Sequence, residues 1–263
     1  MHKAPVTIKI GLIDFHKHPD VGVNEYTKNI GRTVKSLRDD TEVEIIKTFD
    51  NLKIKKQYRL RPSVDISNYD AVILSGSDYN HSHRNVLLRH LVRNIVEDAK
   101  IQHKNVLGIC SGIQLLARAH GYEVRDLPHP EAAWYTMSKT PLGIKNPFFK
   151  GIPDTFPGFS THAKEVVMNG VFDETVLVTN SNCIQAVEFH HTEDCIIVGT
   201  QFHPEDTHAS AQEYLEEYEA ESKGKPLRED TTQTPTTLYG HVLLSNFIHL
   251  AEERKKKHLE HGR

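Results

Sequence analysis

Short apolar runs alternate with segments of helical periodicity in the first half of this chain. The runs at 9–15 and 69–75 are each followed by a segment, 24–37 and 85–100, whose apolar residues recur at helix spacing. Both faces of a parallel sheet are covered by helices, so its strands are continuous apolar runs. The alternation therefore predicts an α/β fold built on a mostly parallel sheet. Further strands are expected at 42–49 and 106–109, and a further helix at 111–120.

The second half of the chain has a different texture. Prolines and glycines are frequent between residues 128 and 158, and the apolar runs that follow look like antiparallel strands appended to the same sheet. These runs are 165–168, 176–179, 186–189 and 196–202. A closing helix is expected at 240–254. We predict a single domain over residues 1–263 with an acidic, partly helical insertion at 206–237, which is a solvated surface excursion or, alternatively, a lid or docking element.

The composition argues against several classes of function. The chain has 263 residues and a formal net charge of -3, without the dense positive field that binding to nucleic acid or a membrane surface requires. It begins without the apolar core of a signal peptide, and no apolar run is long enough to cross a bilayer, so a cytoplasmic protein is expected. Cys110, Cys183 and Cys195 lack metal-ligand spacing, and no carboxylate or cysteine cluster completes a site beside the histidine pairs. We expect neither a metal nor another cofactor.

Cys110 lies between a strand pattern and the start of a helix, within the string Gly-Ile-Cys-Ser-Gly-Ile-Gln. A sharp strand-to-helix turn lifts such a sulfur out of the sheet, and the free amides and dipole of the helix favour its thiolate form. The carboxyl ends of parallel strands are also where such sheets carry their sites. Cys110 is therefore a candidate nucleophile.

A thiolate nucleophile needs a proton acceptor, and an imidazole needs a group that fixes its tautomer. The string Gln-Phe-His-Pro-Glu at 201–205 offers both, because His203 and Glu205 would point to the same side of an extended segment. The carboxylate would then accept a hydrogen bond from one ring nitrogen while the other nitrogen faces Cys110. The spacing permits this contact without requiring it.

Together, the two strings closely resemble the paired signature of class I, triad-type glutamine amidotransferases. The resemblance extends from about residue 9 to residue 250, and within the family the chain is most similar to the glutaminase unit of GMP synthase and its free-standing relatives. Three further strings are similar to that subgroup: Pro-Phe-Phe-Lys-Gly-Ile-Pro at 147–153, Thr-His-Ala-Lys-Glu-Val at 161–166 and Gln-Ala-Val at 185–187. The resemblance implies a flavodoxin-like three-layer sandwich.

The resemblance also implies a role for each matching residue. Cys110 would be the nucleophile, His203 the general base and then acid, and Glu205 the group that orients His203. The backbone amides of Ser77 and Ser111 would form the oxyanion hole. Contacts with the substrate glutamine are implied for Gly76, Gln114, Phe159, Ser160, Thr161 and His162. Water would then cleave the thioester, giving glutamate and ammonia.

The chain departs from the family pattern at two positions. The oxyanion strand of the family usually ends in Gly-Gly-Pro-Gly, whereas this chain has Ser-Gly-Ser-Asp-Tyr at 75–79. Ser77 in a glycine-type conformation would be strained by about 1 kcal/mol or more, which favours a loop that stays inactive until a partner binds. Lys164 stands where the GMP synthase pattern has Asp, on a surface expected to face the partner.

The sequence contains neither a Gly-x-x-x-x-Gly-Lys-Ser/Thr phosphate loop nor a Ser-Gly-Gly-x-Asp-Ser pyrophosphatase loop. It is therefore not expected to activate an ammonia acceptor with ATP. We expect a glutaminase that supplies ammonia to a separate synthetase. Two alternatives stay open: a free-standing γ-glutamyl peptidase or hydrolase on the same triad, and a non-catalytic regulatory subunit that kept the fold.

Overall fold

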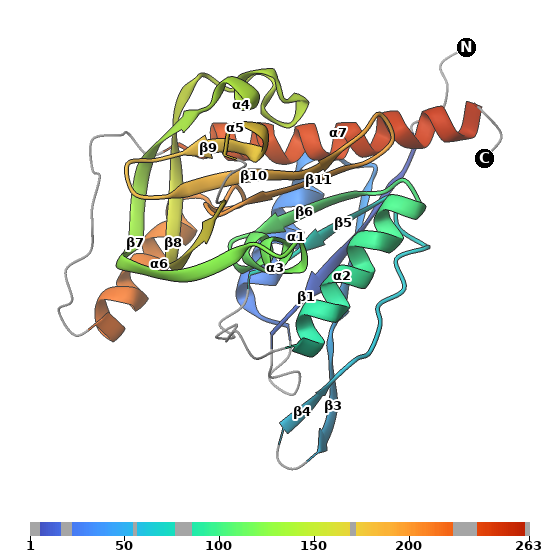
Figure 1. The fold of residues 1–263 in the computed structure, drawn as a ribbon, viewed down its shortest axis with the longest axis horizontal. Coiled ribbons are helices and arrows are strands. Elements are labelled where there is room, and N and C mark those ends of the chain that lie inside the picture. Colours follow the sequence, from blue (N-terminus) through green and yellow to red (C-terminus); the bar gives the residue numbers. More distant parts are fainter. Residues whose placement is uncertain are drawn as a thin grey trace.

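A nine-stranded sheet forms the centre of the molecule (Figure 1). The structure is a computed structural model that describes residues 6–16, 23–54, 57–76, 86–168, 172–222 and 236–260. Five neighbouring strands are parallel: β2 (Thr41–Lys47), β1 (Ile8–Asp14), β5 (Ala71–Leu74), β6 (Asn105–Ile109) and β11 (Ile196–Thr200). Antiparallel strands continue the sheet from β11: β10 (Ile184–His191), β9 (Val176–Thr179), β7 (Glu123–Lys139) and β8 (Thr155–Val167). The predicted α/β class, with a mostly parallel sheet and appended antiparallel strands, is confirmed.

Helices cover both faces of the parallel part of the sheet. On one face, α1 (Glu25–Leu37) and α7 (Leu238–Glu260) share a core with β1 and β6. On the other face, α2 (Val86–Ile101) packs beside α3 (Ser111–Ala119). The remaining helices are α4 (Pro141–Lys145), the short 3-10 helix η2 (Pro147–Phe149), α5 (Phe172–Thr175) and α6 (His208–Ser222). This arrangement is the predicted three-layer sandwich.

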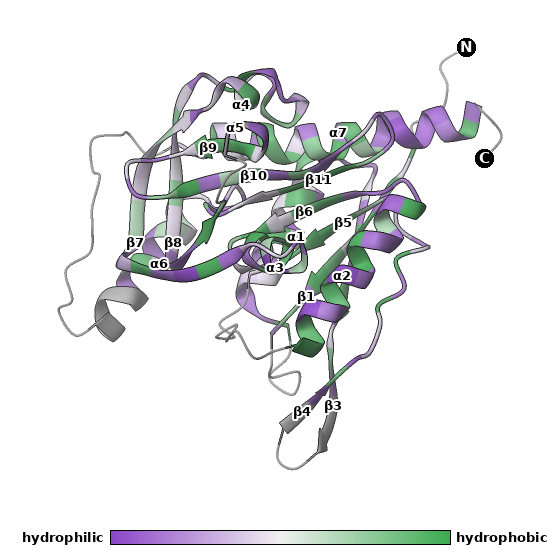
Figure 2. Cartoon of the chain, viewed as in Figure 1, coloured by the Kyte–Doolittle hydropathy of each residue, from purple (hydrophilic) through white to green (hydrophobic). Residues whose placement is uncertain are grey.

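Hydropathy explains which segments became the buried centre. Every residue of β5 and β6 is buried, as continuous apolar runs in a covered parallel sheet require. Helix α2 presents Leu88, Leu91 and Ile95 to the core from one face. Figure 2 shows α7 changing from hydrophobic, where it covers the sheet, to hydrophilic toward its C-terminal end. None of the helices in the described parts of the chain is long and apolar enough to span a membrane.

One predicted strand orientation is wrong. The run at 196–202 was expected to be antiparallel, but β11 is parallel to β6 on one side and antiparallel to β10 on the other. All five of its residues are buried, so its sequence is continuously apolar, as in the parallel strands before it. β11 therefore joins the parallel and antiparallel halves of the sheet, and it ends beside the end of β6.

The patterns also missed two pairs of strands. β7 is a long strand despite Pro128 and Pro130, because its pairing register with β8 shifts between Asp126 and Glu131, where the two prolines lie. A proline cannot donate a ladder hydrogen bond and is accommodated at such an irregularity. Strands β3 (Phe49–Ile54) and β4 (Gln57–Leu60) form a separate hairpin that projects from the body of the molecule (Figure 1), where a polar connection was expected.

Candidate active site

Cys110 lies in the sharp turn between β6 and α3. Its backbone has φ 54° and ψ -109°, a region that residues with a side chain rarely occupy, and its amide donates to the carbonyl of Thr200 at 2.8 Å. Close packing of the turn explains the neighbouring glycines. A Cβ on Gly108 would lie 2.6 Å from the carbonyl carbon of Gly112, and one on Gly112 would lie 2.3 Å from the carbonyl oxygen of Leu74. The helix can therefore start against the sheet only because both positions are glycine.

The strand end next to Cys110 carries His203 and Glu205. The chain leaves β11 at Thr200 and turns, and within this turn His203 Nδ1 lies 2.8 Å from Glu205 Oε1. The expected contact between the two side chains is present, although a turn and not an extended segment forms it. Both side chains are buried, and the backbone amide of His203 donates to the carbonyl of Phe159 on β8 at 2.8 Å. The carboxylate fixes the tautomer that carries hydrogen on Nδ1.

Cys110 and His203 interact although they are far apart in the sequence. Burial alone lowers the pKa of His203, but the charges of Glu205 and Cys110 and their hydrogen bonds hold it well above its ordinary value. His203 Nε2 makes no hydrogen bond of ordinary geometry with any described residue, and it is this nitrogen that is left for the thiol. Longer contacts of this kind are common before a substrate binds. The site thus favours a thiolate paired with an imidazolium.

Two glutamines lie behind the sulfur. Gln201 is fully buried, and its Nε2 donates to Cys110 Sγ at 3.8 Å. Its Oε1 accepts from Gln114 Nε2 at 3.2 Å, and the same Gln114 nitrogen donates to the carbonyl of Lys164 at 3.3 Å. Gln114, predicted to contact substrate, is therefore in place beside the nucleophile through Gln201. Gln201 itself had no predicted role, although it stands within the string that contains His203.

The expected oxyanion residues lie only partly within the described structure. Ser111 is buried at the first position of α3, next to Cys110. Gly76 follows β5, and a Cβ placed on it would lie 3.7 Å from Cys110 Cβ and 3.8 Å from Ser111 Oγ. Ser77 lies outside the described residues, so its role in an oxyanion hole stays a prediction.

Strand β8 brings the remaining predicted substrate residues to the site. The carbonyl of Phe159 accepts from the His203 amide, and that of Thr161 lies 3.8 Å from Cys110 Sγ. Ser160 is fully buried and donates to Gln185 Oε1 at 3.1 Å. The backbone of β8 therefore borders the nucleophile and the base, while at least one of its side chains points into the interior.

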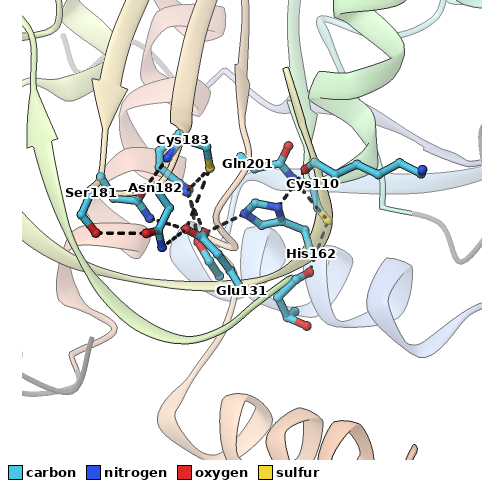
Figure 3. A network of polar contacts seen from close by, with 12 residues as sticks. Cys110, Glu131, His162, Ser181, Asn182, Cys183 and Gln201 are labelled. Carbon is cyan, nitrogen blue, oxygen red and sulfur yellow. Dashed lines mark hydrogen bonds and ion pairs between the residues drawn. The ribbon is translucent and has the colours of Figure 1, made fainter. Parts of the chain in front are cut away.

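His162 belongs to a second buried network, centred on Glu131 of β7 (Figure 3). His162 Nε2 lies 2.8 Å from Glu131 Oε2, and His162 Nδ1 lies 2.9 Å from the carbonyl of Lys164. Both neighbours are acceptors, so the ring satisfies both contacts only when both nitrogens carry hydrogen. Three side-chain amides complete the carboxylate's partners: Asn180 at 2.7 Å, Asn182 at 2.8 Å and Gln185 at 2.8 Å.

The electrostatics of this network follow from its hydrogen bonds. Burial raises the pKa of Glu131, but His162 and the surrounding amides outweigh it and lower the pKa to about 2. The same burial and the negative Glu131 raise the pKa of the nearby Cys183 thiol. The carboxylate is thus permanently charged and fully hydrogen-bonded, and the thiol stays protonated. Sequence spacing gave no sign of this cluster, since its members come from three strands and a turn.

Two groups of described residues have ligand atoms within 4.8 Å of one another, as a metal site would require. In the first, Glu131, His162 and Cys183, the carboxylate oxygens already accept four hydrogen bonds, and a metal would need a thiolate from a cysteine that is protonated. In the second, His203 Nδ1 is engaged by Glu205, with Asp206 completing the group. Neither donor set is free to bind a cation without giving up these contacts.

Comparisons with known proteins agree with this geometry. The family model described as glutamine amidotransferase class-I matches residues 18–220. The glutamine-hydrolysing subunit of GMP synthase from Methanococcus vannielii is 31% identical over 122 residues, which are 46% of this chain and 60% of that protein. The corresponding protein of Methanocaldococcus jannaschii is 33% identical over 116 residues, 44% of this chain and 58% of that protein. The matched stretches therefore span somewhat more than half the length of these relatives.

A solved structure shares the fold over nearly the whole chain. The structure of a glutamine amidotransferase from Thermotoga maritima aligns with a TM-score of 0.65, covering 94% of this chain and 100% of that one. The two sequences are 20% identical. At this identity the likeness establishes the arrangement of helices and strands, and the chemistry has to be argued from this chain's own residues.

Proposed function

This chain belongs to the class-I glutamine amidotransferase family, and from that premise we propose that it hydrolyses the side-chain amide of glutamine to glutamate and ammonia. The single observation that carries the proposal is the convergence of Cys110, His203 and Glu205 at the ends of β6 and β11. In the sequence the two strings are far apart, and only the parallel pairing of these strands brings them to one edge.

The first half of the reaction uses the thiolate and the imidazolium. Cys110 Sγ attacks the amide carbon of glutamine, and the C–N bond breaks after His203 has given its Nε2 proton to the leaving nitrogen. Ammonia leaves, and a thioester joins the glutamyl group to Cys110. Glu205 stabilises the imidazolium and keeps Nε2 directed at the reacting atoms.

The second half regenerates the enzyme. His203, now neutral, takes a proton from a water molecule as the water oxygen attacks the thioester carbon. The C–S bond breaks, glutamate leaves, and the proton on His203 again pairs with the Cys110 thiolate. In this proposal the amides of Ser77 and Ser111 bind the oxyanion, each donor contributing roughly 3 kcal/mol by analogy with hydrolases.

Substrate recognition is proposed for the residues that border the sulfur. Gly76 and the backbone of β8 from Phe159 to His162 lie beside Cys110 and can accept or donate main-chain hydrogen bonds to the amino and carboxylate groups of glutamine. Gln114 reaches the sulfur through Gln201. These contacts are supported by proximity to the nucleophile.

The relatives suggest the use made of the ammonia. Two of them are named as the glutamine-hydrolysing subunit of GMP synthase. We therefore propose that this chain delivers ammonia to a separate synthetase protein. The departure at Lys164 bears on which synthetase that is, because its ammonium group pairs with Asp126 on the outer strands β7 and β8.

Glutamate release from glutamine tests the activity directly. The wild type should release glutamate, alone or with an added synthetase, and Cys110→Ala should abolish the release. Cys195→Ala is the matched control, since Cys195 is bonded to the carbonyl of Lys104, away from the site, and its loss should leave turnover nearly unchanged. Diazo-oxo-norleucine should label Cys110. Equal turnover by the wild type and Cys110→Ala contradicts the proposal, while activity confined to γ-glutamyl peptides supports a peptidase instead.

A further inference from the structure

Asp206 is a second buried carboxyl group beside the catalytic histidine. It follows Glu205 directly, is 2% exposed, and its Oδ2 lies 3.9 Å from His203 Nδ1. Neither this oxygen nor Glu205 Oε2 has a hydrogen-bond partner among the described residues. A buried carboxyl oxygen without a donor is costly, and such a group next to an imidazole requires an explanation. The hydrolysis mechanism proposed above does not use it.

Two helices hold the other oxygen of this carboxyl group. Asp206 Oδ1 accepts from Asn29 Nδ2 of α1 at 2.8 Å and from Ser210 Oγ of α6 at 3.1 Å. Ser210 is itself held, because its Oγ accepts from the amide of Thr207 at 2.9 Å. These bonds fix the direction in which Oδ2 points, toward the histidine.

Helix α6 is also packed onto α1 by an aromatic pair. The rings of Tyr26 on α1 and Tyr214 on α6 stack with centroids 4.5 Å apart, and Tyr26 lies 6.4 Å from the ring of His203. Helix α6 lies within the segment that the sequence marked as an insertion. The expected surface excursion is therefore connected to the catalytic base by two routes, the Asp206 carboxyl group and the Tyr26 ring.

We propose that Asp206 is a positioning residue for His203, and that helix α6, through Ser210, holds its carboxyl group in the orientation that the imidazole requires. This inference rests on the proposed function of the Cys110 site. It assigns α6 a part in the reaction, in place of a passive surface role.

The charge of Asp206 gives this arrangement a measurable consequence. Burial and the negative charge of Glu205 raise the pKa of Asp206 to about 7, although His203, Ser210 and Asn29 oppose the shift. The side chains that face it from α1 and α6 are uncharged: Asn29, Tyr26, Ser210 and Tyr214. The carboxyl group is therefore neutral at pH 6 and mostly negative at pH 8. Its negative form stabilises the imidazolium, and with it the Cys110 thiolate.

Asp206→Asn tests this consequence. The substitution keeps the shape and the acceptor oxygen for Asn29 and Ser210, but the side chain cannot ionise. We expect iodoacetamide to alkylate Cys110 at the same rate in the wild type and the variant at pH 6. At pH 8 the wild type should react about tenfold faster, because an opposite charge at this distance shifts an imidazole pKa by at least about one unit.

Two further variants separate the role of α6 from general stability. Ser210→Ala should shift the pH profile of alkylation in the same direction as Asp206→Asn but by less, and Ser210→Thr, which retains the hydroxyl, should restore the wild-type profile. Gln212→Ala is the matched control on α6, since its exposed amide bonds only to Glu216 among the described residues. Thermal unfolding of each variant identifies those that fail to fold.

The outcomes distinguish this inference from the proposed function. A ratio of alkylation rates that stays constant from pH 6 to pH 8 in a folded Asp206→Asn protein overturns the role of Asp206. Alkylation requires only a reactive thiolate, so the predicted change in ratio supports the inference even if glutamine proves not to be the substrate. Glutamine hydrolysis with an unchanged ratio has the opposite meaning: the function stands and Asp206 is only structural.

Discussion

Two buried pairs of histidine and glutamate lie on neighbouring parts of the sheet and behave differently. His203 with Glu205 and His162 with Glu131 have the same contact, a ring nitrogen 2.8 Å from a carboxylate oxygen. Around Glu131, both oxygens and both nitrogens of its histidine have partners. Around Glu205, one oxygen and the outer ring nitrogen lack one among the described residues.

The difference marks which pair does chemistry. A fully bonded polar cluster makes the interior rigid, whereas one with free valences is retained only where something else uses them. The Glu131 cluster spans β7, β8 and the turn before β10, and thereby fixes the strand whose carbonyls border Cys110. The Glu205 cluster leaves His203 Nε2 to move protons. One pair builds the site and the other operates it.

Replacing each histidine with alanine should break the comparison most sharply. His203→Ala should lower glutamate release by about 10^4-fold, because it removes the general base and the imidazolium, with little loss of stability. His162→Ala should instead lower the unfolding temperature, because it leaves the Glu131 carboxylate buried without its ion partner. Glutamate assays and thermal unfolding on both proteins provide the check. If the two variants lose activity and stability in the same proportion, the division of roles is wrong.

Glu131→Gln should have the next largest effect, a loss of about 3 to 5 kcal/mol in unfolding free energy at pH 7. The folded pKa of Glu131 is about 2, below its ordinary value, so its contribution is complete above about pH 4.5 and disappears as the pH falls toward 2. The gap between the wild type and the variant in urea unfolding should close over that range. Glu213→Gln, at an exposed position of α6, is the control and should change neither curve.

Asp206→Asn should have the smallest effect on stability, and in the opposite direction. The pKa of Asp206 is raised to about 7, so the folded protein binds this proton more tightly than the unfolded chain, and stability falls as the pH rises from about 4 to 7. The variant avoids this loss and should be more stable than the wild type by roughly 1 to 3 kcal/mol at pH 8. Urea unfolding at pH 5 and pH 8 measures it. A variant that is less stable at pH 8 contradicts the assignment of a strained carboxyl group.

The catalytic cluster was predictable because its signal is local. Cys110 has its glycines within two residues on each side, and His203 and Glu205 are two residues apart, so short strings carry the turn, the tautomer and the charge. The Glu131 cluster has no such signal. Glu131 and His162 face each other only through the register of β7 with β8, which two prolines concealed in the sequence.

The same distinction applies to the fold. Continuous apolar runs predicted the parallel strands, because burial of both faces leaves its mark on every residue of the run. The orientation of β11 and the position of α6 depend on which strand and which helix each one meets. Neither partner is close to it in the sequence.

By itself, the sequence determined the covered parallel sheet, the strained cysteine turn and the histidine with its carboxylate, since hydropathy, steric fit and hydrogen bonding act there over a few residues. The tertiary structure alone decided that β6 and β11 end side by side, that Glu131 braces the strand next to Cys110, and that α6 holds Asp206 against His203. Those contacts join distant segments, and strand register and helix packing are properties of the whole folded chain.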